Sequence, residues 1–284
     1  MPELEGVFHR FVNAGGLRMH VAESGEGPPL LLLHGWPQHW WMWRRLIGPL
    51  AETHRVICPD LRGFGWTDAP PGGYDPEILA ADIAALLWSL DVDEPVDVMG
   101  HDWGGWTAFI LALRRPDLVN RILAAGIVHP FVRPRPSSLR GLWRFWYQWA
   151  LALPGIGPRV IRTAGTRNPT LLYLGARPEI WSEEERRIFS EQFREPARAN
   201  ASTLLYRHAV LRLPAQLRQY RRMHMEHPAL LLFPAEDAVQ KTIALGGYET
   251  NAPNLEVEVV PGARHFIVEE QPELVLARAR ELFA

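Results

Sequence analysis

Gly100-His101-Asp102-Trp103-Gly104-Gly105 is the stretch of sequence that decides the fold. Residues 96–99 come just before it and are typical of a strand, while residues 104–115 carry apolar side chains at helical spacing. Glycines two positions before and two positions after Asp102 allow a strand to reverse sharply into a helix, because they add no Cβ to a crowded turn. The pattern predicts a nucleophile elbow that exposes Asp102 at the edge of a sheet.

An aspartate in this turn predicts a particular kind of reaction. Its carboxylate is ionised at neutral pH and is a nucleophile without the help of a base. Attack on an ester would give only an anhydride, whereas attack on a saturated carbon with a leaving group gives an alkyl ester that water can hydrolyse. Asp102 therefore favours substrates such as epoxides or alkyl halides.

The hydrolysis of that ester needs a base, and His265 has the best position among the eleven histidines. It lies in a loop after the last predicted strand, residues 255–260. Asp237 follows the strand predicted at residues 230–233 and is the expected orienting acid, with its neighbour Glu236 as the alternative. Nucleophile, acid and histidine then follow one another in the chain order expected for a nucleophile elbow.

Negative charge that gathers on the ester during hydrolysis needs hydrogen-bond donors. The backbone N–H of Trp103, directly after the nucleophile, is one expected donor. The other is the N–H of Trp36 in His34-Gly35-Trp36-Pro37, a loop that directly follows an unbroken run of leucines at residues 30–33. These two N–H groups form the predicted oxyanion hole.

Alternation of strands and helices along most of the chain indicates an α/β fold with a mainly parallel sheet. Strands are predicted at residues 8–12, 17–23, 29–33, 55–58, 96–99, 119–125, 230–233 and 255–260, and helices at residues 77–90, 104–115, 241–248 and from 272 onward. Residues 131–226 break the pattern and are predicted to be helical, with a capping box at Ser182 and Glu185. The chain therefore divides into a core, residues 1–130 and 227–284, and a helical insertion, residues 131–226.

The formal net charge of −2 argues against a nucleic-acid-binding protein. It conceals an uneven distribution, because residues 131–226 contain 17 arginines and 7 acidic residues and carry +10, while the remainder carries −12. We expect the basic insertion to dock against the acidic core.

Membrane and export signals are missing from the sequence. The longest apolar segment, residues 28–43, is broken by Pro, Gly and His, so no run approaches the roughly 18 residues that a span requires. The first ten residues lack the basic and apolar regions of a signal peptide, and the single cysteine, Cys58, fits a reducing compartment. We expect a cytoplasmic protein with no membrane or nucleic-acid partner.

Five segments make the chain resemble the α/β-hydrolase fold enzymes with an aspartate nucleophile and, among them, the epoxide hydrolases. They are HGWP at 34–37, DLRGFGWTDAP at 60–70, GHDWGG at 100–105, the turn at Asp237, and GARHFIVEEQPE at 262–273. The resemblance implies a mostly parallel eight-stranded sheet flanked by helices, with residues 131–226 as an inserted helical cap. It also implies conversion of a small apolar epoxide and water to a vicinal diol, with no cofactor and no metal.

The same resemblance assigns two tyrosines of the cap. Tyr147 and Tyr206 match the pair that donates to the epoxide oxygen, although Leu205 stands where the family pattern has Trp. An opening epoxide releases an alkoxide, which needs a proton that a phenol can supply. Trp36, Trp103 and Trp146 are expected to contact the substrate.

Two alternatives remain open. A haloalkane or haloacid dehalogenase would use the same Asp102, His265 and Asp237, with the indole N–H of Trp103 holding the departing halide. A non-catalytic ligand-binding protein on the same fold is disfavoured because all three catalytic positions are filled. The sequence does not specify the epoxide, the selectivity or the oligomeric state.

Overall fold

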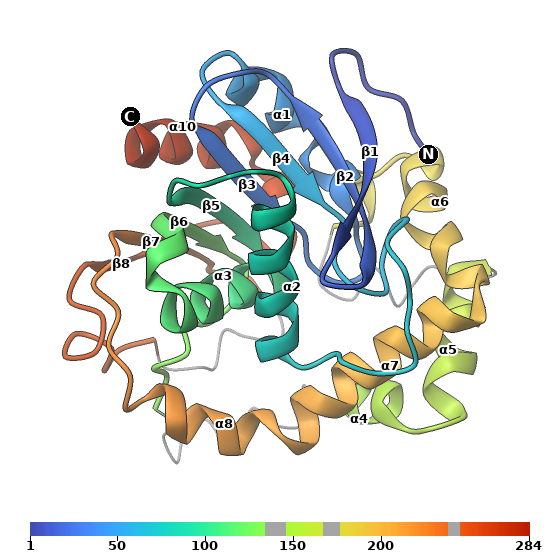
Figure 1. Cartoon of the computed structure of the whole chain (residues 1–284). Coiled ribbons are helices and arrows are strands. Elements are labelled where there is room, and N and C mark those ends of the chain that lie inside the picture. The colour runs from blue at the N-terminus through green and yellow to red at the C-terminus, as the bar shows by residue number, and fades with distance from the viewer. Residues whose placement is uncertain (134–145, 167–176, 238–244) are drawn as a thin grey trace.

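A sheet with strand order β1-β2-β4-β3-β5-β6-β7-β8 lies at the centre of the protein (Figure 1). The structure is a computed structural model, and it describes residues 1–133, 146–166, 177–237 and 245–284. The strands are β1 (Phe8–Ala14), β2 (Leu17–Ser24), β3 (Pro29–Leu33), β4 (Arg55–Pro59), β5 (Val96–His101), β6 (Val119–Ala125), β7 (Ala229–Pro234) and β8 (Leu255–Val260). The α-helices are α1 (Arg44–Ala51), α2 (Pro76–Ser89), α3 (Trp103–Arg114), α4 (Trp146–Ala152), α5 (Ile156–Thr166), α6 (Glu183–Glu191), α7 (Pro196–Leu211), α8 (Leu213–Tyr220), α9 (Ile267–Glu270) and α10 (Pro272–Phe283).

The pairing of the strands is mostly parallel. β1 and β2 form an antiparallel hairpin whose turn, Gly15 and Gly16, has positive φ at both residues. β2 is also antiparallel to β4, and the remaining neighbours, from β4 through β8, are parallel. The predicted eight-stranded, mostly parallel sheet is confirmed.

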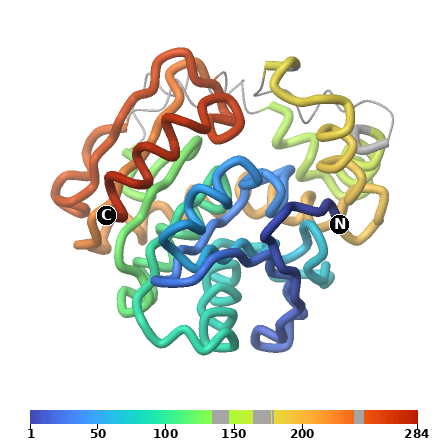
Figure 2. Tube along the Cα trace, turned by 90° about the horizontal axis from the view of Figure 1, so that it is seen from above, coloured from blue at the N-terminus to red at the C-terminus, as the bar shows by residue number. Residues whose placement is uncertain are grey.

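The leucine run of β3 shows why the sheet needs helices on both faces. Leu31 and Leu33 pack in the apolar cluster that includes residues of α2 and α3, and Leu30 and Leu32 pack in the cluster that includes residues of α1 and α10. Side chains alternate between the two faces of a strand, so a strand that is apolar at every position must be covered twice. Figures 1 and 2 show the helices arranged accordingly.

Between β6 and β7 the chain leaves the sheet and builds a separate helical layer from α4 to α8 (Figure 1). The predicted capping box begins α6: the Ser182 hydroxyl accepts from the Glu185 N–H at 3.1 Å, and the Glu185 carboxylate accepts from the Ser182 N–H at 2.8 Å. The boundaries of this layer at residues 131 and 226 stay predictions. The helix predicted at residues 241–248 lies mainly outside the described residues, and residues 245–248 are not helical.

Ion pairs between this helical layer and the rest of the chain do not follow the expected charge pattern. Within the described ranges, Arg177 pairs with the core residue Glu236 at 3.6 Å, which is the predicted polarity. The more buried pair has the reverse polarity, because Arg44 of α1 donates to Glu185 of α6. These ion pairs therefore do not support docking against an acidic core as the general reason why residues 131–226 are rich in arginine.

Candidate active site

The turn between β5 and α3 has the sharp geometry that the glycines predicted. Asp102 takes φ 49° and ψ −120°, a conformation that non-glycine residues adopt only where the surroundings enforce it, at a cost of about 1–3 kcal/mol. A Cβ on Gly104 would lie 2.0 Å from the carbonyl oxygen of Leu33, and one on Gly100 would lie 2.5 Å from the nitrogen of Gly105. Both glycines are therefore required for β5, β3 and α3 to meet at this turn.

The carboxylate of Asp102 is buried and held by backbone donors. The N–H of Trp36 donates to its Oδ2 at 3.0 Å, and the N–H of Trp103 also hydrogen-bonds to this carboxylate. Burial raises the pKa of Asp102, while the neighbouring His265 and the two N–H groups act in the opposite direction. The two donors expected of an oxyanion hole thus converge on the expected nucleophile.

His265 lies between two carboxylates. Its Nδ1 is 2.9 Å from Oδ2 of Asp237, and its Nε2 is 3.9 Å from Oδ1 of Asp102. Burial alone would lower the pKa of His265, but the hydrogen bond and charge of Asp237, together with the charge of Asp102, raise it to about 9. The bond to Asp237 leaves Nε2 facing Asp102, as a base that acts on water at that carboxyl group requires.

The neighbouring acid, Glu236, points elsewhere. Its side chain is about half exposed, at 49%, and its carboxylate lies 3.6 Å from Arg177 and 3.8 Å from Arg264. Asp237, in contrast, is fully buried against His265. Of the two acids that the sequence left open, the structure brings Asp237 to the histidine.

Tyr147 of α4 and Tyr206 of α7 meet near Asp102. Their ring centroids are 6.3 Å apart, and the ring of Tyr206 lies 5.0 Å from that of Trp36 and 6.5 Å from that of Trp103. Burial, reinforced by the charge of Asp102, raises the pKa of Tyr147 to about 12 and holds the pKa of Tyr206 well above its usual value. Both phenols are therefore neutral O–H donors at ordinary pH.

Comparison with known proteins identifies the family. A family model described as alpha/beta hydrolase fold matches residues 28–272. The chain belongs to this family. The predicted fold of this α/β-hydrolase is therefore confirmed.

Relatives of this α/β-hydrolase include epoxide hydrolases. A soluble epoxide hydrolase from Corynebacterium sp. (strain C12) is 32% identical, with 98% of each chain covered. The AB hydrolase superfamily protein YfhM from Bacillus subtilis (strain 168) is 31% identical, with 96% of each chain covered. The crystal structure of an epoxide hydrolase from Vigna radiata is similar with a TM-score of 0.85 and 27% identity, and 99% of each chain is covered. The resemblance noted in the sequence is confirmed.

Trp146, which was expected to contact substrate, lies on the outside of the hydrolase. Its side chain is 61% exposed at the start of α4, whereas the next residue, Tyr147, packs against the apolar core. Successive residues of a helix point about 100° apart, so the two side chains leave α4 in different directions. We do not retain Trp146 among the residues proposed to bind substrate.

A contact that the sequence did not reveal joins the loop of Trp36 to the helix of Tyr206. The indole N–H of Trp36 donates to Oγ of Ser202 on α7 at 3.0 Å, and Ser202 is fully buried. Trp36 therefore has two functions: its backbone N–H contacts Asp102, while its side chain contacts the helix that carries Tyr206. The two residues are 166 positions apart in the chain, and a serine in a helix gives no signal of such a partner.

Replacement of Ser202 by alanine is expected to destabilise the hydrolase by about 1–3 kcal/mol, because it leaves the buried indole N–H of Trp36 without its acceptor. Chemical denaturation of both proteins measures this change. In Trp36→Phe, which has no indole N–H, the same serine substitution should cost much less. Equal costs in the two backgrounds would show that this hydrogen bond is not responsible.

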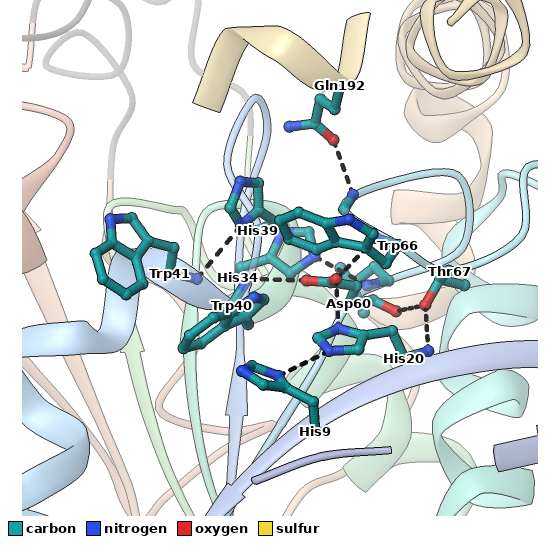
Figure 3. A network of polar contacts seen from close by, with 12 residues as sticks. His9, His20, His34, His39, Trp40, Trp41, Asp60, Trp66, Thr67 and Gln192 are labelled. Atoms are coloured by element: carbon teal, nitrogen blue, oxygen red, sulfur yellow. Dashed lines mark hydrogen bonds and ion pairs between the residues drawn. The ribbon is translucent and has the colours of Figure 1, made fainter. Parts of the chain in front are cut away.

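Asp60 holds the backbone just beyond the loop of Trp36, at Trp40 (Figure 3). It directly follows β4, and its carboxylate accepts from the N–H groups of Trp40 and Trp66, each at 2.9 Å, and contacts Nδ1 of His20 at 2.7 Å. Burial opposes the ionisation of Asp60, but the hydrogen bond and charge of His20 outweigh it and lower the pKa of Asp60 to about 2. Residues 60–70 were among the segments that resemble the epoxide hydrolases. The sequence signal for the structural role of Asp60 is a single acidic residue directly after a buried strand.

Gln192 ties the helical layer to two loops of the core (Figure 3). Its amide oxygen accepts from the N–H of Gly65 at 2.8 Å, and its amide nitrogen donates to the carbonyl oxygen of Pro37 at 2.9 Å. Pro37 follows Trp36 directly, so the helical layer holds the loop of Trp36 at both Gln192 and Ser202.

His101 supports the loop that carries His265. Its Nε2–H donates to the carbonyl oxygen of His265 at 2.8 Å, and burial, with the nearby His265 ring, lowers the pKa of His101 to about 3. The neutral ring thus holds the backbone of the loop in place. Among the described residues no group of three or more His, Cys, Asp or Glu side chains is arranged to hold a metal ion.

Proposed function

We propose that this α/β-hydrolase is an epoxide hydrolase that forms a covalent ester on Asp102 and releases a vicinal diol. The observation that carries the proposal is the pair of neutral phenols, Tyr147 and Tyr206, beside a buried carboxylate. A halide leaves as a stable anion and needs only N–H contacts, whereas an opening epoxide needs a proton. Epoxide hydrolases among the relatives give independent support.

In the first proposed step, a carboxylate oxygen of Asp102 attacks an epoxide carbon and the bond between that carbon and the ring oxygen breaks. The electron pair of the broken bond goes to the ring oxygen, which takes a proton from Tyr147 or Tyr206. Both phenols lie in the helical layer, which we propose is a cap over the core, formed by residues 131–226. The substrate is therefore held between cap and core.

In the second proposed step, His265 accepts a proton from water, and the water oxygen attacks the carbonyl carbon of the ester. The N–H groups of Trp36 and Trp103 stabilise the resulting oxyanion. Collapse of this intermediate breaks the ester bond to the substrate carbon. The two protons of the water, one of them carried by His265, pass to the leaving alkoxide and to the tyrosinate left by the first step, which gives the diol and restores the phenol, the neutral histidine and the carboxylate of Asp102. Asp237 keeps the histidine oriented throughout.

Formation of the ester is expected to lower the pKa of His265, so that the protonated histidine loses its proton and can act as a base. The charge of Asp102 is one cause of the pKa of about 9, and that charge disappears when Asp102 is esterified. Ester hydrolysis should therefore accelerate with pH as His265 loses its proton, with a midpoint below 9. Single-turnover kinetics between about pH 6 and about pH 10 measure this step. A rate that is independent of pH over that range would contradict the assignment of His265.

The proposal is tested by paired assays on an epoxide panel and a haloalkane panel, with Asp102→Ala as the control. Release of diol without release of halide supports it. Release of halide without diol would favour the dehalogenase alternative, in which the indole of Trp103 holds the halide. Turnover of neither panel, together with tight binding of a small ligand, would favour a non-catalytic binding protein.

A further inference from the structure

Most arginines of the helical layer lie in segments without a single acidic residue. Residues 131–178 and 196–225 together contain 14 arginines and no Asp or Glu, whereas residues 179–195 contain six acidic residues. Exposed arginines in the described parts of these segments are Arg159 and Arg162 of α5, Arg207 of α7, Arg212, Arg218 of α8 and Arg222. These segments therefore carry positive charge that no carboxylate of the same segments balances.

Tryptophans are exposed in the same layer. Trp146 and Trp149, three positions apart on α4, are 61% and 57% exposed, and Leu153 and Ile156 follow at 48% and 50%. Leu151 and Tyr147 face the interior from the same helix. Four neighbouring large apolar residues exposed together are typical of a surface that binds a partner.

The basic and apolar residues lie on helices that pack against one another. α7 contacts α4, α5 and α8, and these four helices form the side of the molecule away from α1 (Figure 1). We call the exposed residues Trp146, Trp149, Leu153, Ile156, Arg159, Arg207, Arg212 and Arg218 the outer cap surface. Among the described residues, the ion pairs of the helical layer with the core are made by other side chains, such as Arg177 and Glu185, and not by the arginines of this surface.

We propose that the outer cap surface docks on an anionic lipid bilayer. Tryptophan side chains favour the boundary between headgroups and acyl chains, and arginines close to an anionic membrane are attracted to its headgroups. A nucleic-acid duplex offers phosphates, but its bases are paired and stacked, so it offers no apolar phase to the two tryptophans and to Leu153 and Ile156 beside them. The remainder of the chain carries −12, so an anionic membrane repels it and the protein approaches with its cap first.

The docking is peripheral. Within the described ranges no helix has both the length and the apolar character needed to cross a bilayer. The absence of a spanning run was the reason to expect no membrane partner from the sequence, and a surface contact needs no such run. If the proposed function also holds, α4 would bring Tyr147 close to a bilayer in which apolar epoxides dissolve.

Vesicle binding tests the proposal without any measurement of catalysis. The intact protein is sedimented with vesicles of phosphatidylcholine alone and with vesicles that also contain phosphatidylglycerol. We expect binding only to the anionic vesicles, and a fall in binding as the salt concentration rises from about 0.02 M to about 0.3 M. Failure to bind the anionic vesicles at low salt overturns the proposal, whatever the enzyme activity.

Variants locate the surface. Trp146→Ala/Trp149→Ala should weaken binding by roughly 10-fold or more, while Trp88→Ala, which removes a side chain 83% exposed on α2, should leave it unchanged. Arg212→Gln/Arg218→Gln should reduce the dependence on phosphatidylglycerol, and Arg115→Gln, an exposed arginine of the core, should not. Thermal unfolding confirms that each variant is folded. An equal loss of binding in Trp88→Ala and in the Trp146/Trp149 variant would overturn the assignment.

Two further outcomes would assign the surface to another partner and overturn the proposal. One is binding to a DNA duplex as tightly as to the anionic vesicles, with no loss in the Trp146/Trp149 variant. The other is a dimer in solution that this variant dissociates, with no binding to vesicles.

Discussion

Asp102→Ala is expected to form no diol above the uncatalysed rate. The carboxylate is the only atom group proposed to bond to the substrate, and alanine leaves no nucleophile in the turn between β5 and α3. Loss of the nucleophile of a catalytic triad costs roughly 10⁴-fold or more in rate. Product analysis on an epoxide panel measures the change, with Glu236→Gln, an exposed neighbouring acid, as the active control.

Isotope labelling of the wild-type protein tests the same role without a mutation. In ¹⁸O-labelled water, the diol from a first turnover should contain unlabelled oxygen, because that oxygen comes from the carboxylate of Asp102. The label should instead enter Asp102 and appear in the diol of later turnovers. Label in the diol of the first turnover would mean that water attacks the epoxide directly and that Asp102 is not a nucleophile.

Tyr147→Phe/Tyr206→Phe is expected to abolish epoxide opening, while each single substitution leaves reduced activity. Phenylalanine keeps both rings and their packing beside Trp36 and Trp103, so the change removes little except the O–H donors. Loss of a positioned acid costs roughly 10²–10⁴-fold in rate. Burst kinetics of ester formation measure the opening step separately from hydrolysis.

Tyr220→Phe is the matched control for this pair. Its hydroxyl donates to Glu77 of α2 at 2.9 Å, so epoxide opening should continue in that variant. If the Tyr147/Tyr206 double variant still opened epoxides at the wild-type rate, these phenols would not be the proton donors, and the strongest reason to prefer an epoxide over a haloalkane would be lost.

The sequence was sufficient to predict the sheet and the site residues that directly follow its strands. Gly100 and Gly104 are needed for a turn that no other residue fits, and the leucines of β3 require two layers of helices. Asp237 and His265 follow β7 and β8, and the topology of the sheet brings the ends of these parallel strands to one edge. Such constraints are local or follow from strand order, so they can be predicted from the chain alone.

Contacts between distant segments could not be predicted in this way. The partners of Ser202 and Gln192 depend on how the helical layer sits on the loops of the core, and their own surroundings in the sequence do not record it. The prediction that Trp146 contacts substrate was not supported for a related reason. A motif places a residue on a helix but does not tell which face of that helix points to the interior. The net charge of the insertion likewise did not predict which side chains pair across the interface.

The hydrogen bond between Trp36 and Ser202 limits how this enzyme can be re-engineered. One way to change the substrate range of such a protein is to exchange its helical insertion for that of a relative. An imported insertion without a hydrogen-bond acceptor at position 202 would leave the indole of Trp36 unpaired and shift the loop whose backbone N–H holds the nucleophile. Chimeras should therefore take residues 36 and 202 from the same parent protein.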